Sequence, residues 1–159
     1  MNLLFASDHA GFELKNALVA YARTLAYDVS DLGAYVYEPE DDYPAIIARA
    51  AERVSKDPTG TRAIVLGGSG QGEAIVANRF PGVRAVVYNG ESRGAVFNDV
   101  DEIRLSREHN DANILSLGAR FLTEHEAREV LLRWLDIPFS GEARHARRIA
   151  AIDAVTVRI

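Results

Sequence analysis

Cysteine is absent from this chain of 159 residues. Its absence excludes disulfides, thiolate nucleophiles and cysteine-ligated metals together, and it fits a cytoplasmic location. Long apolar runs are also lacking: none approaches the roughly 18 residues that a membrane span needs, and the first residues carry no basic leader. We therefore expect a cytoplasmic protein without an export signal and without a membrane partner.

Positive charge is in the minority, with 18 Lys and Arg against 23 Asp and Glu and a formal net charge of -5. A nucleic-acid partner is not expected, because neutralising phosphates needs a broad basic face. Hydrophobic residues at 48% and charged residues at 26% match an ordinary globular protein. The one linker-like stretch, Lys56 to Gly60, is short enough to be a loop, so we expect a single domain over residues 1–159.

Short apolar runs alternate with segments of helical periodicity along the chain. Strands are expected at 2–7, 28–32, 62–66, 83–88 and 113–117, and helices at 11–25, 43–56, 72–80, 123–135 and about 141–155. This alternation predicts an α/β fold: a doubly wound, five-stranded parallel sheet in a three-layer α/β/α sandwich, with ligands at the carboxyl ends of the strands. The last helix has no strand to follow it, so it is an extra element that either packs on a second subunit or covers its own sheet.

A glycine-rich loop, GGSGQGE, follows the third expected strand, with four glycines in the six positions from Gly67 to Gly72. Such a loop lets several backbone N–H groups converge on an anion at a helix start. A dinucleotide fingerprint would need glycine at Glu73, and a Walker A loop would need a lysine that is absent from 67–77. A receiver domain would need aspartate at Gly67. Glu73 beside converging N–H groups suits proton transfer in an enolisation, which needs neither a redox cofactor nor an obligatory metal.

Further polar clusters lie near other strand ends. Asp8 and His9 leave the first strand together, and a histidine near neutrality, such as His109 in the segment 107–111, could pass protons to and from a sugar ring oxygen. Arg144 and Arg148 are four residues apart, so they share a helix face and could clamp a phosphate dianion. Each cluster also has a plain alternative: a helix cap, a solvated loop or a basic surface face.

Six segments in order, SDHAG, DDYP, GGSGQGE, REHND, LGAR and RHARR, resemble the motif set of the ribose-5-phosphate isomerase B and galactose-6-phosphate isomerase family. The resemblance covers residues 2 to about 152. It implies a Rossmann-like α/β sandwich and a homodimer, with a tetramer as the alternative, whose active sites lie at the subunit interface. It further implies isomerisation of a phosphorylated sugar through a cis-enediolate, with no cofactor and no metal.

The resemblance also implies a role for each matching residue. Glu73 is similar to the general base of the subgroup that lacks a catalytic cysteine, and Ser69 stands where the other subgroup keeps that cysteine. By the same resemblance, Ser69, Gly70 and Gly72 would form the anion hole, and His109 with Asp8 would assist ring opening. Asn110 and Tyr43 would contact the sugar. The phosphate would be bound by His9, Arg120, Arg144 and Arg148, some of them from the partner subunit.

The segment from Tyr88 to Asp111 is longer than the family pattern leads us to expect, and it borders the substrate or forms a surface elaboration. The leading hypothesis is interconversion of ribose 5-phosphate and ribulose 5-phosphate. Isomerisation of galactose 6-phosphate, allose 6-phosphate or a tetrose 4-phosphate is the alternative within the class. A non-catalytic sugar-phosphate binding module is the alternative outside it, although such a module could dispense with Glu73.

Overall fold

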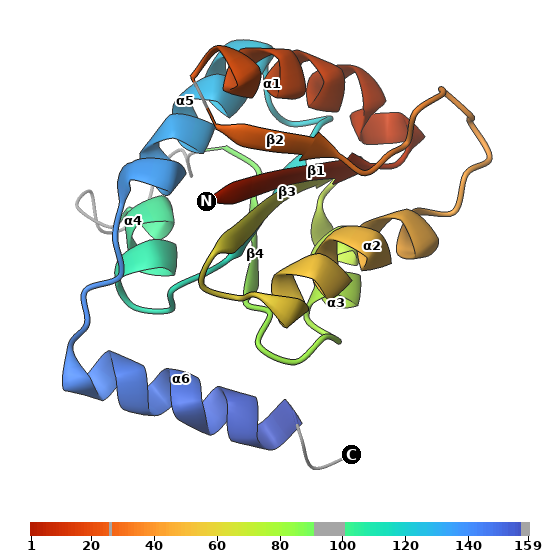
Figure 1. The fold of residues 1–159 in the computed structure, drawn as a ribbon. Helices are drawn as coiled ribbons and strands as arrows, with labels where there is room; N and C mark the ends of the chain where they lie inside the picture. The colour runs from red at the N-terminus through yellow and green to blue at the C-terminus, as the bar shows by residue number, and fades with distance from the viewer. Residues whose placement is uncertain (26, 91–100, 157–159) are drawn as a thin grey trace.

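The structure, a computed structural model, describes residues 1–25, 27–90 and 101–156 (Figure 1). Its elements in chain order are β1 (Asn2–Ser7), the 3-10 helix η1 (His9–Gly11), α1 (Phe12–Thr24), β2 (Asp28–Asp31), α2 (Tyr43–Lys56), β3 (Thr61–Gly67), α3 (Gln71–Ala77), β4 (Ala85–Tyr88), α4 (Glu102–Glu108), β5 (Ile114–Gly118), α5 (Glu124–Asp136) and α6 (Ala143–Thr156). Among the described residues, none of the helices is long and apolar enough to cross a membrane.

The five strands form one parallel sheet in the order β2-β1-β3-β5-β4. This confirms the predicted doubly wound α/β fold. The chain leaves β1 in one direction for β2 and returns to pair β3 on its other side, so the order reverses between β1 and β3. Crevices at the carboxyl ends of strands beside such a switch point are where ligands bind in this architecture.

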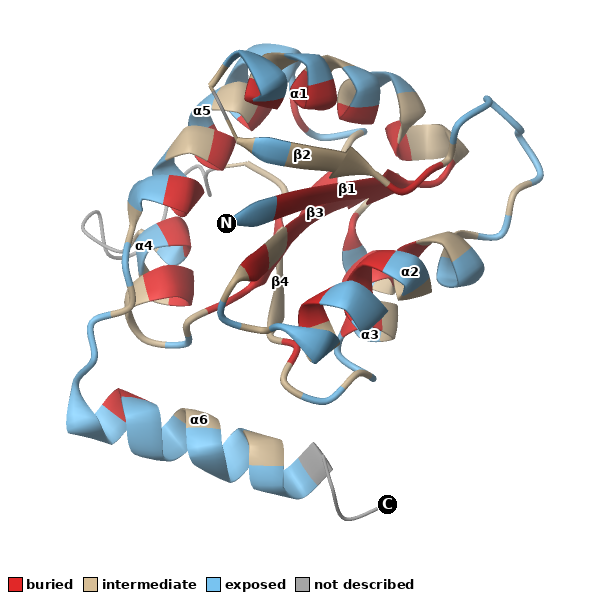
Figure 2. Cartoon of the chain, viewed as in Figure 1, coloured by how far each residue is buried: buried red, intermediate tan, exposed pale blue. Residues whose placement is uncertain are grey.

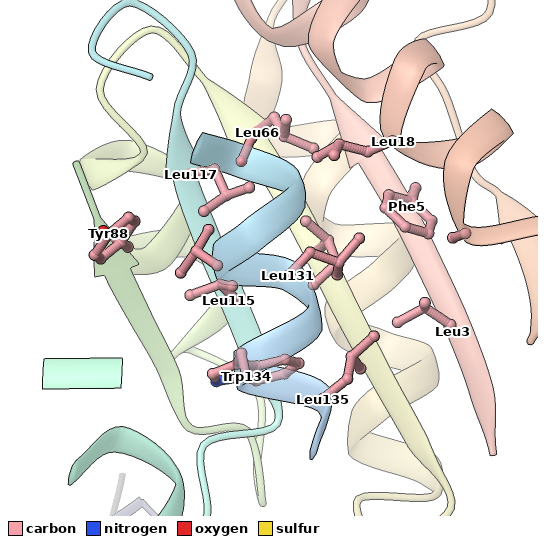
Figure 3. Packing of buried hydrophobic residues seen from close by; sticks show 14 of the residues in the cluster. Leu3, Phe5, Leu18, Leu66, Tyr88, Leu115, Leu117, Leu131, Trp134 and Leu135 are labelled. Carbon is pink, nitrogen blue, oxygen red and sulfur yellow. The ribbon is translucent and has the colours of Figure 1, made fainter. Parts of the chain in front are cut away.

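Two apolar clusters cover the two faces of the sheet. One contains Trp134 and other residues of α1, α4 and α5, and the second is built on α2 and α3. Side chains alternate along β3, with Ile64 and Leu66 in the first cluster and Ala63 and Val65 in the second. Figure 3 shows α5 lying over the sheet with the leucines of the first cluster between them. The result is the predicted three-layer sandwich, which holds the strand ends rigidly.

Several elements differ from the sequence-based expectation: η1 was not expected, and α3 ends at Ala77 rather than at residue 80. Helix α4 was not predicted, because its segment is polar; it is anchored by the buried Arg107, whose guanidinium donates to the carbonyls of Ala112 at 2.5 Å and Ile137 at 3.2 Å. Strand β4 begins at Ala85 rather than Val83, because Arg84 N–H instead donates to the Asn113 side chain at 2.8 Å. Residues 91–100 of the long segment lie outside the described residues.

Helix α6 lies apart from the sandwich. Figure 1 shows it below the body of the molecule, beyond the edge where α4 lies, and Figure 2 shows that almost all of its surface is exposed. Within residues 143–155 of this helix, His145 is buried, at 2% exposure. The alternative in which this helix covers its own sheet is therefore wrong for the single chain.

Candidate active site

The end of β1 carries the first polar group of the site. Asp8 is buried and caps η1, its carboxylate accepting a hydrogen bond from Gly11 N at 3.0 Å. A Cβ on Gly11 would lie 2.6 Å from the Cβ of Leu66, so only glycine lets η1 approach β3 this closely. This approach brings Asp8 and His9 next to the loop that follows β3.

The loop after β3 places the Glu73 carboxyl group against the backbone of Gly67. A Cβ on Gly67 would lie 2.0 Å from Oε1 and 2.2 Å from Cδ of Glu73, so the carboxyl group occupies the space that a side chain would fill. Glu73 is 4% exposed. Burial raises the pKa of Glu73, its own backbone N–H opposes this, and the neighbouring Asp8 raises it further. A carboxylate in this state is a stronger base than a solvated one.

Residues 69–72 of the glycine loop are packed tightly against neighbouring elements. Gly70 adopts a φ of 73°, in the left-handed region, and its carbonyl accepts a hydrogen bond from Ser116 Oγ at 2.6 Å. Gly72 has no room for a side chain, because a Cβ would lie 2.7 Å from the ring of Tyr43. Ser69 Oγ accepts from Gln71 N at 3.4 Å. Tyr43, Ser69, Gly70 and Gly72 thus surround the start of α3.

Arg120 reaches the same place from the end of β5. Its backbone N–H donates to Gly68 O at 3.2 Å, and its guanidinium lies over Gly68, where a Cβ would be 3.1 Å from Cζ. Strands β1, β3 and β5 are not all neighbours, but their carboxyl ends lie on one edge of the sheet, with β3 between the other two. Glu73, Asp8, His9 and Arg120 are therefore brought together.

His9 has a partner that sequence reasoning did not identify. Oδ1 of Asp41 accepts from His9 N at 3.1 Å and from His9 Nδ1 at 2.7 Å. This bond raises the pKa of His9, against the effects of burial and of the Arg120 charge. Side-chain atoms of Asp8, His9 and Asp41 that could bind a metal ion lie within 4.8 Å of one another. His9 is hydrogen-bonded to Asp41, however, and Asp8 to Gly11 N, so we assign these side chains to a hydrogen-bond network.

A second cluster of predicted site residues lies at the other end of the sheet. His109 follows α4, and its ring stacks on that of His145, with centroids 4.1 Å apart and planes 29° apart. Burial lowers the pKa of His145, and the charges of His109 and Arg144 lower it further. Arg144 Nε lies 3.0 Å from His145 Nε2 and 2.9 Å from Glu142 Oε2.

The two clusters do not meet within one chain. Ile114, at the start of β5, pairs with Ala63, whereas Gly118, at its end, pairs with Gly67. Residues before β5 are thus at the amino edge of the sheet and Glu73 is at the carboxyl edge, separated by the length of β3, roughly 20 Å for seven residues. The predicted cooperation of His109 with Asp8 is absent from the described single chain. Asn110, Arg144 and Arg148 are exposed at the amino edge too.

Asp41 and His145 are the two residues at these clusters that sequence reasoning missed. Asp41 belongs to the DDYP segment, in which the resemblance implies a role only for Tyr43. His145 lies between Arg144 and Arg148 on α6. The signal that could have found it is its i, i+4 spacing to Ile149, which is typical of a contact face.

A doubly wound sheet with a buried carboxyl group on a glycine loop at its switch point defines a small α/β protein with a ligand site between β1, β3 and β5. The chain belongs to the Ribose/Galactose Isomerase family, whose sequence model matches residues 3–152.

Relatives and solved structures agree with this membership. The chain is 40% identical over 149 residues to the ribose-5-phosphate isomerase B of Mycolicibacterium paratuberculosis, covering 94% of this chain and 87% of the relative. It is 33% identical to that of Escherichia coli, over 98% of this chain and 97% of the relative. The Mycoplasma genitalium ribose-5-phosphate isomerase B, solved with bound ribulose-5-phosphate, superposes with a TM-score of 0.89 at 32% identity, covering 99% and 97% of the two chains.

Proposed function

We propose that this chain is an aldose-ketose isomerase that interconverts ribose 5-phosphate and ribulose 5-phosphate. The observation that carries the proposal is the Glu73 carboxyl group, buried against Gly67 at the start of α3 with a raised pKa. The Mycoplasma genitalium relative, with ribulose-5-phosphate bound, supports the choice of substrate. A binding module without catalysis would have no use for a buried base beside a helix start.

The reaction needs one base and one oxyanion site. The Glu73 carboxylate takes the proton from C2 of the open-chain aldose, and the negative charge develops on O1, where the N–H groups of Ser69, Gly70 and Gly72 would stabilise it. The O2 hydroxyl proton passes to O1, and Glu73 returns its proton to C1. The product is the ketose, with the same atoms and electrons as the aldose.

Phosphate binding and ring opening complete the proposal. His9 and Arg120 lie at the carboxyl edge with Glu73, and they would hold the phosphate. His109, Asn110, Arg144 and Arg148 lie at the other edge, so we assign them to the site of a second copy of the chain. A homodimer thus explains why both sets match family positions while one chain separates them.

Exposed apolar surface supports that assembly. Val155 on α6 is 71% exposed and Ile75 on α3 is 60% exposed. An open hollow of about 520 Å³ adjoins the helix that carries Glu73. It is lined by the apolar Ala74, Ile75, Ala85 and Val87 and by the polar Gln71, Asn78 and Arg79. A second copy of α6 with its apolar residues suits this surface. A tetramer is the alternative assembly, and the cytoplasmic location stays a prediction from composition.

The first experiment is a coupled assay of EDTA-treated protein against ribose 5-phosphate, allose 6-phosphate, galactose 6-phosphate and erythrose 4-phosphate in parallel. We expect ribose 5-phosphate to have the highest kcat/KM. A preference for another sugar phosphate would change the substrate and keep the reaction. Absence of turnover on all four, with phosphate binding retained, would favour the binding module.

Mixing two inactive variants tests the shared site. Glu73→Gln and His109→Asn chains, unfolded together and refolded at equal concentration, should recover about a quarter of wild-type activity, because half of the dimers contain one intact site out of two. Each variant refolded alone should stay inactive. A mixture as inactive as its parts would contradict a site built from two chains.

A further inference from the structure

Asp41 makes two hydrogen bonds to His9 that join the loop before α2 to the end of β1. The two residues are 32 positions apart, yet a single oxygen, Oδ1, accepts hydrogen bonds from both the backbone N–H and the ring Nδ1 of His9. The other oxygen, Oδ2, is buried and finds no hydrogen-bond partner within the described ranges. The carboxylate is thus committed to His9, and fixes both the backbone and the ring of that residue.

The chemistry of this contact determines the tautomer of His9. A carboxylate is only an acceptor, so at 2.7 Å the proton between the two groups belongs to Nδ1. Nε2 is then the ring nitrogen left for a ligand. When the ring is protonated, Nε2 is a charged N–H donor, which is the form that a phosphate dianion accepts from.

Several other groups face the His9 ring. Asp8, from the end of β1, favours the charged ring, while Arg120, from the end of β5, and burial disfavour it. Tyr37, from the loop between β2 and α2, meets the ring edge-on, with centroids 6.4 Å apart, and itself packs on Phe12 of α1. Side-chain exposure is 27% for His9 and 11% for Asp41, so the pair is screened from solvent without being sealed.

We propose that Asp41 is a positioning residue that holds His9 protonated and turned so that Nε2–H is donated to the phosphate group of the substrate. This inference rests on the proposed function for the identity of the ligand. It also assigns a task to the loop before α2: the loop carries the carboxylate that keeps a cation beside Arg120, where two like charges would otherwise repel.

Imidazole NMR titration of the full-length protein tests the first half of the inference, with His9 assigned through His9→Gln. In the wild type, Nδ1 should carry the proton in the neutral form, and the pKa should lie above the ordinary value of about 6.5. In Asp41→Asn, which keeps an acceptor and removes the charge, the pKa should fall. Glu40→Gln makes the same charge change on an exposed residue of the same loop, and should leave the pKa unchanged.

Calorimetric titration with inorganic phosphate tests the second half. Asp41→Asn should bind phosphate more weakly than wild type, by up to about tenfold, and the difference should shrink as pH falls and His9 becomes charged in both proteins. In isomerase assays the same variant should show a KM that rises with pH, while kcat stays within about threefold. A purely structural role would instead weaken binding at every pH.

The outcomes separate this inference from the proposed function. NMR and phosphate titrations need no turnover, so an inactive wild type would remove the isomerase and still test Asp41. An unchanged His9 pKa in Asp41→Asn, or equal loss of phosphate binding at all pH values, would overturn the inference. Should Asp41→Asn fail to fold, the wild type decides: an Nε2-protonated neutral tautomer, or a His9 pKa below 6.5, would overturn it as well.

Discussion

Replacing Gly67 by alanine should inactivate the site without unfolding the protein. The added Cβ would lie 2.0 Å from Oε1 of Glu73, and ordinary contact begins near 3.4 Å, so the carboxylate must retreat by about 1.4 Å. The atom in the way is the far end of a flexible side chain, so retreat is easier than a shift of the sheet. Since Gly67 ends β3 with no positive φ, alanine suits the backbone.

The magnitude follows from the role of Glu73 in the proposed reaction. Displacing a reacting group by about 1 Å costs on the order of 100-fold in rate, and complete loss of a general base costs about 10² to 10⁴. We therefore expect kcat for ribose 5-phosphate to fall at least 100-fold in Gly67→Ala, with KM within a few-fold of wild type, because the three atoms nearest to the added Cβ all belong to Glu73. The free energy of unfolding should change by no more than about 1 kcal/mol.

The double variant decides whether the loss acts through Glu73. Steady-state kinetics of Gly67→Ala, Glu73→Gln and the pair should show that alanine has almost no further effect once the carboxylate is gone. A Gly67→Ala protein with kcat within tenfold of wild type would refute the close packing of base and loop. Equal losses in both backgrounds would show that alanine harms the loop itself and not the base.

Two further predictions concern stability. Burial raises the pKa of folded Glu73 above its unfolded value, so ionising this group disfavours the folded state as pH rises through the folded pKa. Glu73→Gln should therefore melt at a higher temperature than wild type at pH 7.5. The difference between the two melting temperatures should disappear near pH 4. Thr123 caps α5 and forms a capping box with Glu126, so Thr123→Ala should lower the free energy of unfolding by about 1 kcal/mol in urea titrations; equal stability would show that the cap contributes nothing.

The sheet could be predicted from sequence because its strands are apolar runs followed at once by glycine or polar residues. All residues from Leu3 to Ala6 and from Ala63 to Leu66 are apolar and buried. Helix α4 escaped prediction for the opposite reason. Its stability depends on a buried guanidinium, that of Arg107, and a charged residue in a polar stretch gives no periodic apolar signal.

The site was predictable only where its residues stand directly at strand ends. Asp8 and Glu73 follow β1 and β3 within a few residues, so the topology alone places them together. Asp41 could not be found in this way, because it lies at the end of a loop without periodicity, and only the folded chain shows which residue that loop approaches. For His109 the expected parallel sheet already implies the placement, because a residue just before the strand at 113–117 lies at the amino edge, opposite Glu73.

Charge explains why the proposed site needs a second chain. At the carboxyl edge, Arg120 and, when it is protonated, His9 supply positive charge, while Asp8, Asp41 and Glu73 supply three carboxyl groups. A phosphate dianion that approaches these residues of a single chain therefore meets no excess of positive charge, although His9 and Arg120 lie close enough to the site to contact it. Arg144 and Arg148 of a second copy would reverse the balance, and guanidinium pairs are the groups best suited to a phosphate. In the proposed dimer, assembly therefore supplies the positive charge that the carboxyl edge of one chain lacks for binding the substrate.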